Sequence, residues 1–148
     1  GYNSYAKNYP PLREDRDQKA LIEAVKNSVV DVISSGHTPV SRLTKDLSFE
    51  DAAFGIESLG LLFSVLYTRL VCANEVSMER VSELTSFNPS VILGLENKGL
   101  IKEGYDADLF LFDPSRPTEI GEFSPYKDTS LQGVVTHTFK GGELIYEL

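Results

Sequence analysis

Val29-Val30-Asp31-Val32-Ile33 is short, apolar and β-branched, which is typical of a buried parallel β-strand. It follows residues 14–27, where apolar side chains recur at helical spacing and acidic side chains occupy the first turn. A helix that leads directly into a buried strand predicts an α/β fold. The next segment, residues 34–51, is expected to be a long loop, and long loops at strand ends are often functional.

Three further helices are expected in the middle of the chain. Residues 56–73 are apolar around much of the helical circumference, so this helix should pack on more than one side. A second helix is expected to begin after Ser77, which is a good N-cap residue. Asn88-Pro89 is expected to start a short third helix, with Asn as its cap, that ends at Gly94.

The last third of the chain has the pattern of a small antiparallel sheet. Residues 108–113, 134–139 and 143–146 are short apolar runs that predict strands. Lys140-Gly141-Gly142 separates the last two runs, and its glycines suit the positive φ angles of a tight hairpin turn. Residues 114–131 hold three prolines and many polar side chains, so we expect a surface loop there.

Charge and composition exclude several classes of function. The 22 acidic and 14 basic residues give a net charge of −8 without any Lys/Arg cluster, so nucleic acid is not an expected partner. The single cysteine, Cys72, lies in an apolar run and is expected to be a core thiol in a reducing compartment. Residues 1–12 lack the apolar core of a signal peptide, and residues 59–73 are too short and polar to span a membrane. We therefore expect a cytoplasmic protein without a membrane role.

The segment from Gly99 to Asp113 carries a specific motif. It reads GLIKEGYDADLFLFD and closely resembles the G-x-I-x-x-G-x-D-A-D-L segment of the amidohydrolase superfamily. Asp106 and Asp108 lie within it and could be proposed as paired catalytic carboxylates. Aspartates beside a glycine more commonly form turns, so we assign them no catalytic role.

Further blocks narrow the resemblance to bacterial dihydroorotases. These blocks are Pro10-Pro11-Leu12-Arg13, the run from Val32 to Pro39 and the run from Ala53 to Glu57. The resemblance implies an α/β fold made of the C-terminal portion of a (β/α)8 TIM-type barrel in residues 1–95. Residues 96–148 would then be part of the small flanking β domain of amidohydrolases. It also implies a family zinc site and the reversible opening of dihydroorotate to carbamoyl aspartate, with catalytic groups at the C-terminal ends of barrel strands.

Three positions depart from the dihydroorotase pattern. Where similar dihydroorotases read N-P-P-L-R, this sequence has Tyr9 at the Asn position. Where they read D-H-A-P-H, it has Gly36 at the Asp position and Val40 at the final His. In the family, the Asn and that His hold substrate and the Asp is a metal-associated acid/base. Loss of a positioned acid/base typically costs about 10²–10⁴ in rate, so we predict that this loop no longer supports hydrolysis.

Other site residues persist, but they do not make a metal site. Phe54 and Gly55 match residues that contact substrate through the backbone, so they form at most a vestigial substrate site. His37 is a lone histidine without partners at ligand spacing, and His137 alternates with apolar residues on a predicted strand; we expect structural roles for both. A hydrolytic zinc site needs about three converging protein ligands, so no metal or other cofactor is expected in this chain itself.

Three interpretations follow from these patterns. The first is a catalytically inactive dihydroorotase-like protein that serves as a structural partner of aspartate carbamoyltransferase, as the resemblance suggests. The second is an active zinc amidohydrolase whose metal site lies on another portion, with a hydroxyl of Ser35, Thr38 or Ser41 near the lost Asp. The third is a self-sufficient binding module, which we disfavour because two barrel strands, after Lys7 and at residues 29–34, cannot close a barrel. Their edges should be covered by a homo-oligomer or another partner.

Overall fold

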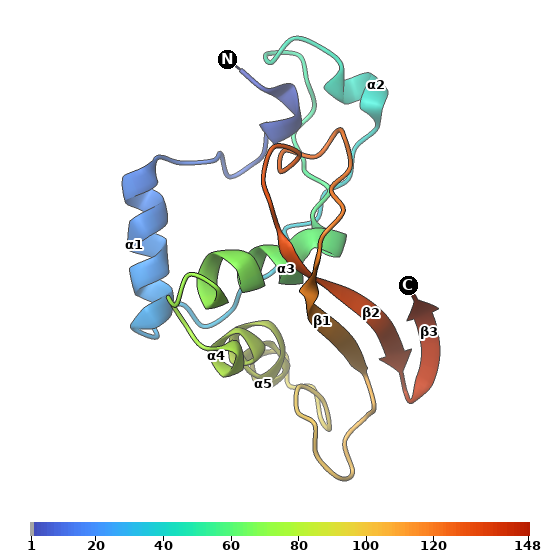
Figure 1. Ribbon diagram of the computed structural model, residues 1–148. Coiled ribbons are helices and arrows are strands. Elements are labelled where there is room, and N and C mark those ends of the chain that lie inside the picture. The colour runs from blue at the N-terminus through green and yellow to red at the C-terminus, as the bar shows by residue number, and fades with distance from the viewer. Residues whose placement is uncertain (1) are drawn as a thin grey trace.

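The computed structural model in Figure 1 describes residues 2–148 as a helical layer packed on a small sheet. The helical elements, which include short 3₁₀ and π turns, are η1 (Ser4–Ala6), α1 (Asp15–Lys26), α2 (Arg42–Lys45), η2 (Leu59–Leu61), α3 (Leu62–Leu66), η3 (Tyr67–Val71), α4 (Met78–Ser82), η4 (Glu83–Phe87) and α5 (Asn88–Ile92). The strands are β1 (Leu109–Pro117), β2 (Gln132–Lys140) and β3 (Glu143–Glu147). No helix among residues 2–148 is long and apolar enough to cross a bilayer.

The first helix agrees closely with its sequence pattern. α1 has two acidic residues in its first turn and Lys26 in its last, which complements the helix dipole at both ends. Val25 is buried, and Ile22 packs against the core formed by Leu66, Leu70 and Val81. The apolar stripe read from the sequence is therefore the face that attaches α1 to the helical layer.

The strand predicted at residues 29–33 is wrong for the described structure. This segment is extended, but Val29 is 72% exposed, and only Ile33 makes a backbone bond away from α1, donating its N–H to the Leu84 carbonyl at 2.9 Å. Side chains of Arg80 and Asn88 donate to its carbonyl oxygens instead. A β-strand needs a neighbouring strand to pair with, and the part of the chain described offers none here or after Lys7.

The predicted helices are present with shifted limits. The helix expected over residues 56–73 begins at Leu59 and is held in two directions, by the core cluster and by the sheet. Ser77 caps α4 as predicted, its hydroxyl accepting from the Arg80 N–H at 3.2 Å. The cap predicted at Asn88 is wrong, because α4, η4 and α5 run on with helical angles through this residue. Gly94, at φ +64°, follows the end of α5 as expected.

The three predicted strands are confirmed as one antiparallel sheet in the order β1-β2-β3. Gly141 and Gly142 have φ angles of +57° and +84°, so the hairpin between β2 and β3 uses the conformation that glycine makes accessible. β1 runs further than expected, to Pro117, and the loop between β1 and β2 is correspondingly shorter. This loop returns from the sheet toward η1 and α2 (Figure 1).

A close joint at Gly133 connects the helical layer to the sheet. The Ser64 hydroxyl in α3 donates to the Gly133 carbonyl in β2 at 2.6 Å, and Ser64 is buried. The Phe112 ring of β1 lies over Gly133, so closely that a Cβ at this position would be 1.9 Å from the ring. Phe63 and Tyr67 pack edge-on against Phe112 with centroid separations of 4.8 and 5.2 Å. The aromatic cluster of α3, η3 and β1 therefore packs against the backbone of Gly133, which has no side chain.

Cys72 is exposed, so the prediction of a core thiol is wrong. The apolar run that contains it does form a helix, but Cys72 is the residue after η3, where the helix ends. A helix end directs part of its circumference to solvent even when the preceding turns are buried. Leu70, two residues earlier, occupies the core position that the pattern had suggested for this stretch.

We predict that Gly133→Ala lowers the free energy of unfolding by about 3 kcal/mol or more, because the new Cβ overlaps the Phe112 ring at a positive φ. Gly60→Ala is the matched control, since Gly60 has open space and its φ is not positive. Urea denaturation of the complete protein measures both changes. Equal midpoints for the two variants would contradict the proposed joint.

Candidate functional site

The loop of residues 34–41 lies against the segment of residues 55–58. The Thr38 N–H donates to the Ile56 carbonyl at 3.0 Å, and the Ser58 hydroxyl donates to the Ser35 carbonyl at 2.7 Å. The Gly55 N–H in turn donates to the Lys7 carbonyl at 3.1 Å. Backbone hydrogen bonds therefore join the loop to the block of residues 53–57, and that block to Lys7, which precedes the block of residues 10–13.

The three substituted positions, Tyr9, Gly36 and Val40, bring no carboxylate and no imidazole to this meeting point. Gly36 has a φ of +56°, and no atom lies within 4 Å of where its Cβ would be. Tyr9 is 79% exposed and meets the Phe54 ring edge-on at a centroid separation of 6.4 Å. Val40 presents an apolar side chain to the adjoining cavity. The space at Gly36 could hold a larger side chain, but none is there.

His37 acts as a hydrogen-bond acceptor for the start of a helix. Its Nδ1 accepts from the backbone N–H groups of Ser58 and Leu59, each at 3.1 Å, just where η2 begins. An Nδ1 that accepts two hydrogen bonds carries no proton, so the neutral ring has its proton on Nε2. The half-buried ring thus satisfies two of the N–H groups that helix starts leave unpaired.

His137 lies elsewhere, on β2, opposite Leu111 of β1 and Glu147 of β3. Its Nδ1 is 3.0 Å from the Thr136 hydroxyl, and its ring stacks on Phe139. Over residues 2–148, no group of three His, Cys, Asp or Glu side chains converges in a way that could hold a metal ion. The described part of the chain gives the family's zinc no ligand set.

Gly55 is fixed by packing. Its φ is +134°, and a Cβ would lie 2.3 Å from the Thr38 carbonyl oxygen, so only glycine fits beside the loop. Phe54 is 53% exposed, and the Lys7 ammonium lies 4.5 Å from its ring centroid. The Gly55 conformation is required to seat residues 34–41.

Two buried lysines hold the site together and were not identified from the sequence. Lys45 is 4% exposed, and its Nζ donates to the carbonyl oxygens of Ser4 at 3.0 Å and Lys7 at 2.9 Å. Lys7 is 8% exposed and donates to the Glu50 carbonyl at 2.8 Å. Burial, together with the nearby Lys7 charge, lowers the pKa of Lys45. Lysines in polar loops normally indicate solvated surface, so no sequence signal marked them.

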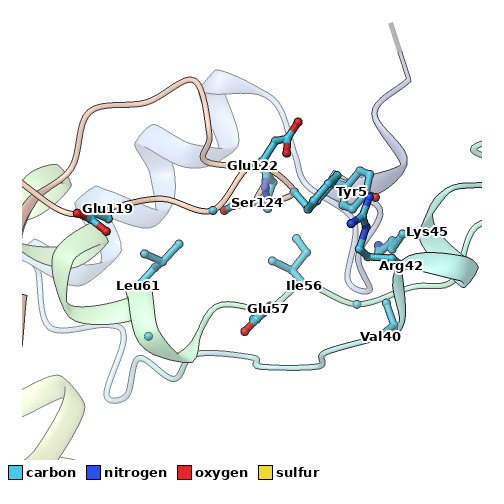
Figure 2. Close-up of a pocket in the computed structure, with 15 residues that line it drawn as sticks. Tyr5, Val40, Arg42, Lys45, Ile56, Glu57, Leu61, Glu119, Glu122 and Ser124 are labelled. Atoms are coloured by element: carbon cyan, nitrogen blue, oxygen red, sulfur yellow. The ribbon is translucent and has the colours of Figure 1, made fainter. Parts of the chain in front are cut away.

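A cavity of about 450 Å³ adjoins the loop (Figure 2). Val40 and Gly55 border it, whereas Tyr9, Gly36, His37 and Phe54 do not. The rest of its lining comes from η1, α2, the segment leading into η2, and the loop between β1 and β2. Of the three substituted positions, Val40 alone therefore borders this cavity.

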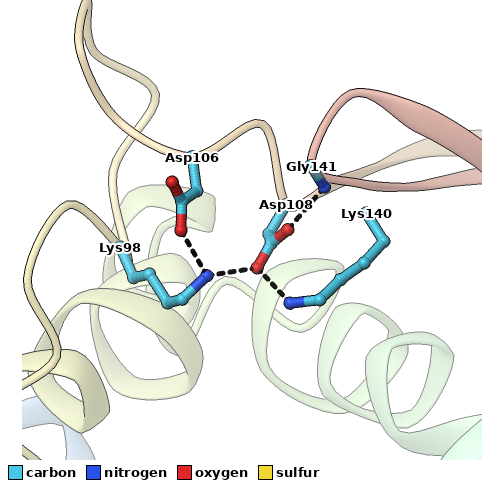
Figure 3. Close-up of polar contacts among 5 residues, drawn as sticks. All are labelled: Lys98, Asp106, Asp108, Lys140 and Gly141. Atoms are coloured by element: carbon cyan, nitrogen blue, oxygen red, sulfur yellow. Dashed lines mark hydrogen bonds and ion pairs between the residues drawn. The ribbon is translucent and has the colours of Figure 1, made fainter.

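Asp106 and Asp108 belong to an ion cluster at the hairpin (Figure 3). Lys98 donates to both carboxylates at 2.6 Å. Asp108 also accepts from Lys140 at 2.5 Å and from the Gly141 N–H at 2.8 Å. Hydrogen bonds from Lys140 and Lys98 hold the pKa of Asp108 far below its usual range. Asp108 thus links Lys98, after α5, to the β2–β3 turn, while Asp106 pairs with Lys98.

We predict that His37→Ala lowers the free energy of unfolding by about 1 kcal/mol or more, because two backbone N–H groups lose their acceptor. His37→Asn, whose side-chain oxygen can replace Nδ1, should retain most of the stability. Urea denaturation, with hydrogen exchange at Ser58 and Leu59, provides the measurement. The role assigned to Nδ1 fails if the Ala and Asn variants exchange at the same rate.

Comparison with known proteins places these features in a family. Residues 12–145 match the amidohydrolase family. A dihydroorotase of Carboxydothermus hydrogenoformans is 40% identical over 122 residues, which cover 82% of this chain and 28% of the relative. A dihydroorotase of Lactobacillus gasseri is 33% identical over 154 residues, covering 98% of this chain and 36% of the relative. The chain thus spans about a third of the length of these relatives.

Solved structures agree on the fold. The dihydropyrimidinase of Brevibacillus agri is similar with a TM-score of 0.89 at 25% identity, over 97% of this chain and 34% of that one. The D-hydantoinase of a Thermus species gives a TM-score of 0.86 at 23% identity, with the same coverage. The resemblance to dihydroorotases within the amidohydrolase superfamily is confirmed. The chain belongs to the amidohydrolase family.

Proposed function

We propose that this chain is the C-terminal part of a dihydroorotase-like protein of pyrimidine biosynthesis that no longer catalyses hydrolysis. In this proposal residues 1–95 complete a TIM-type barrel and residues 96–148 contribute to the flanking β domain. The protein works in the cytoplasm as a structural partner of aspartate carbamoyltransferase. The likeness to named dihydroorotases over nearly the whole chain supports the pathway.

The observation that carries the loss of catalysis is Gly36. By the resemblance this residue stands at the family's acid/base position, and, its two chain neighbours aside, no atom lies within 4 Å of where its Cβ would be. Ser35 and Thr38, the hydroxyls beside it, are engaged with backbone groups: the Ser35 oxygen accepts from the His37 N–H, and the Thr38 hydroxyl donates to the Gly36 carbonyl. A hydroxyl without a base is not a competent proton acceptor at neutral pH.

The retained framework supports a scaffolding role. Backbone bonds hold residues 34–41 in place, and the lysines at positions 7 and 45 are bonded to carbonyl oxygens. If the loop has kept its shape although its catalytic groups are lost, its shape serves another purpose. Contact with a partner protein is such a purpose. The exposed Val29 and the free edge of β3 would then be covered by a second copy or by another partner.

We predict that the complete protein, supplied with zinc, turns over dihydroorotate at least about 10²-fold more slowly than the dihydroorotase of Carboxydothermus hydrogenoformans assayed in parallel. Gly36→Asp with Val40→His and Tyr9→Asn tests whether the remaining framework can still support the reaction. Turnover of the unaltered protein within tenfold of the relative would support the alternative, an active zinc amidohydrolase with its metal site outside these residues.

We further predict that the complete protein co-elutes with aspartate carbamoyltransferase from the same cells in size-exclusion chromatography, and raises the melting temperature of that enzyme. A mixture with the dihydroorotase of Lactobacillus gasseri in its place controls for non-specific association. Separate elution at micromolar concentrations would contradict the partnership while leaving the loss of catalysis intact.

A further inference from the structure

The cavity that adjoins the loop has one cationic end. Arg42, Lys45 and Tyr5 gather there from α2 and η1, on the right in Figure 2. Glu57, Glu119 and Glu122 also line the cavity, and Asp46 bonds to Tyr5, but neither Arg42 nor Lys45 forms an ion pair with a carboxylate among residues 2–148. Solubility does not explain why Arg42 and Lys45 lie at the same end of a cavity.

Both cations keep hydrogen-bond donors unused. Lys45 is 4% exposed and lines the cavity. Its ammonium has three N–H donors, and two of them bond to carbonyl oxygens. The Arg42 guanidinium forms no ion pair with any carboxylate among residues 2–148. A buried ammonium with a spare donor and an unpaired guanidinium are together suited to an anionic group.

The cationic end is held in place by stacking. The Arg42 guanidinium lies 3.6 Å from the Phe123 ring centroid, and the Tyr5 ring lies 5.6 Å from the same ring. The Tyr5 hydroxyl is anchored by a hydrogen bond to Asp46. A guanidinium stacked through its face still has its edge donors free for a planar carboxylate. The loop between β1 and β2 thus positions the cation that it covers.

The remainder of the cavity is suited to an apolar body. Ile56, which is 7% exposed, and Leu61 form its floor beside the Phe123 ring. In Figure 2 the Glu57 and Glu122 side chains point away from this floor, while Glu119 stands at the far end. About 450 Å³ is within the usual range for small-molecule sites.

We propose that this cavity binds a small organic carboxylate, with its carboxylate on Arg42 and Lys45 and a compact apolar body on Ile56, Leu61 and Phe123. The site adjoins the substituted positions without coinciding with them: Val40 borders it, whereas Tyr9 and Gly36 do not. It does not depend on whether the protein hydrolyses anything. An anion without an apolar part would leave the floor uncovered, so inorganic phosphate is the weaker fit.

Calorimetric titration of the complete protein with sodium benzoate, at fixed ionic strength, tests the proposal. Benzamide is the neutral analogue of the same shape, and inorganic phosphate is the anion without an apolar body. Benzoate should bind at least about tenfold more tightly than either, since charge-assisted bonds are the stronger ones. Equal binding of benzamide, tighter binding of phosphate, or no benzoate binding at all would overturn the proposal.

Variants place the binding in this cavity. Arg42→Gln should weaken benzoate binding at least about tenfold, because the exposed side chain supplies the carboxylate donors without supporting the core. Arg69→Gln is the matched control, since Arg69 is exposed on η3 and lies outside the cavity. An Arg42 variant that keeps its circular dichroism spectrum and binds benzoate like the unaltered protein would also overturn the proposal.

Discussion

The structure depends on the joint between α3 and β2 at Gly133. The Phe112 ring occupies the space where a side chain would be, and Ser64 bonds to the carbonyl beneath it. Because the ring is wedged between Gly133 and the aromatic residues of α3 and η3, the sheet cannot shift along the helices without breaking the contact. The loop between β1 and β2 starts and ends at this sheet, so the joint also sets where Phe123 meets Arg42.

The loop of residues 34–41 shows how a site's framework and its chemistry can be separated. Its shape comes from backbone bonds, from the Gly55 close contact and from His37, which accepts from the start of η2. None of these contacts involves a side chain at position 36 or 40. Under the proposed function, replacing an acid/base and a substrate-binding group at these positions would remove their chemistry at little cost to stability.

Sequence patterns predicted the parts of the fold that depend on local chemistry. The α1 stripe, the Ser77 cap and the Gly141-Gly142 turn each follow from a few neighbouring residues. The strand at residues 29–33 was wrong because pairing depends on a partner strand, which no local pattern supplies. The roles of the lysines at positions 7 and 45 could not be predicted, since their partners lie 38 to 43 positions away. The cavity arises where still more distant residues meet, as Tyr5 and Phe123 do.

The central claim is that the loop survives as framework rather than as a metal site, and His37 tests it most directly. The ¹⁵N chemical shifts of its ring, measured in the complete protein with and without zinc, report which nitrogen carries the proton and whether either binds metal. We expect a neutral ring protonated on Nε2, with Nδ1 bonded to the backbone, and no change when zinc is added. Loss of the Nε2 proton on adding zinc would show a ligating histidine and contradict the account.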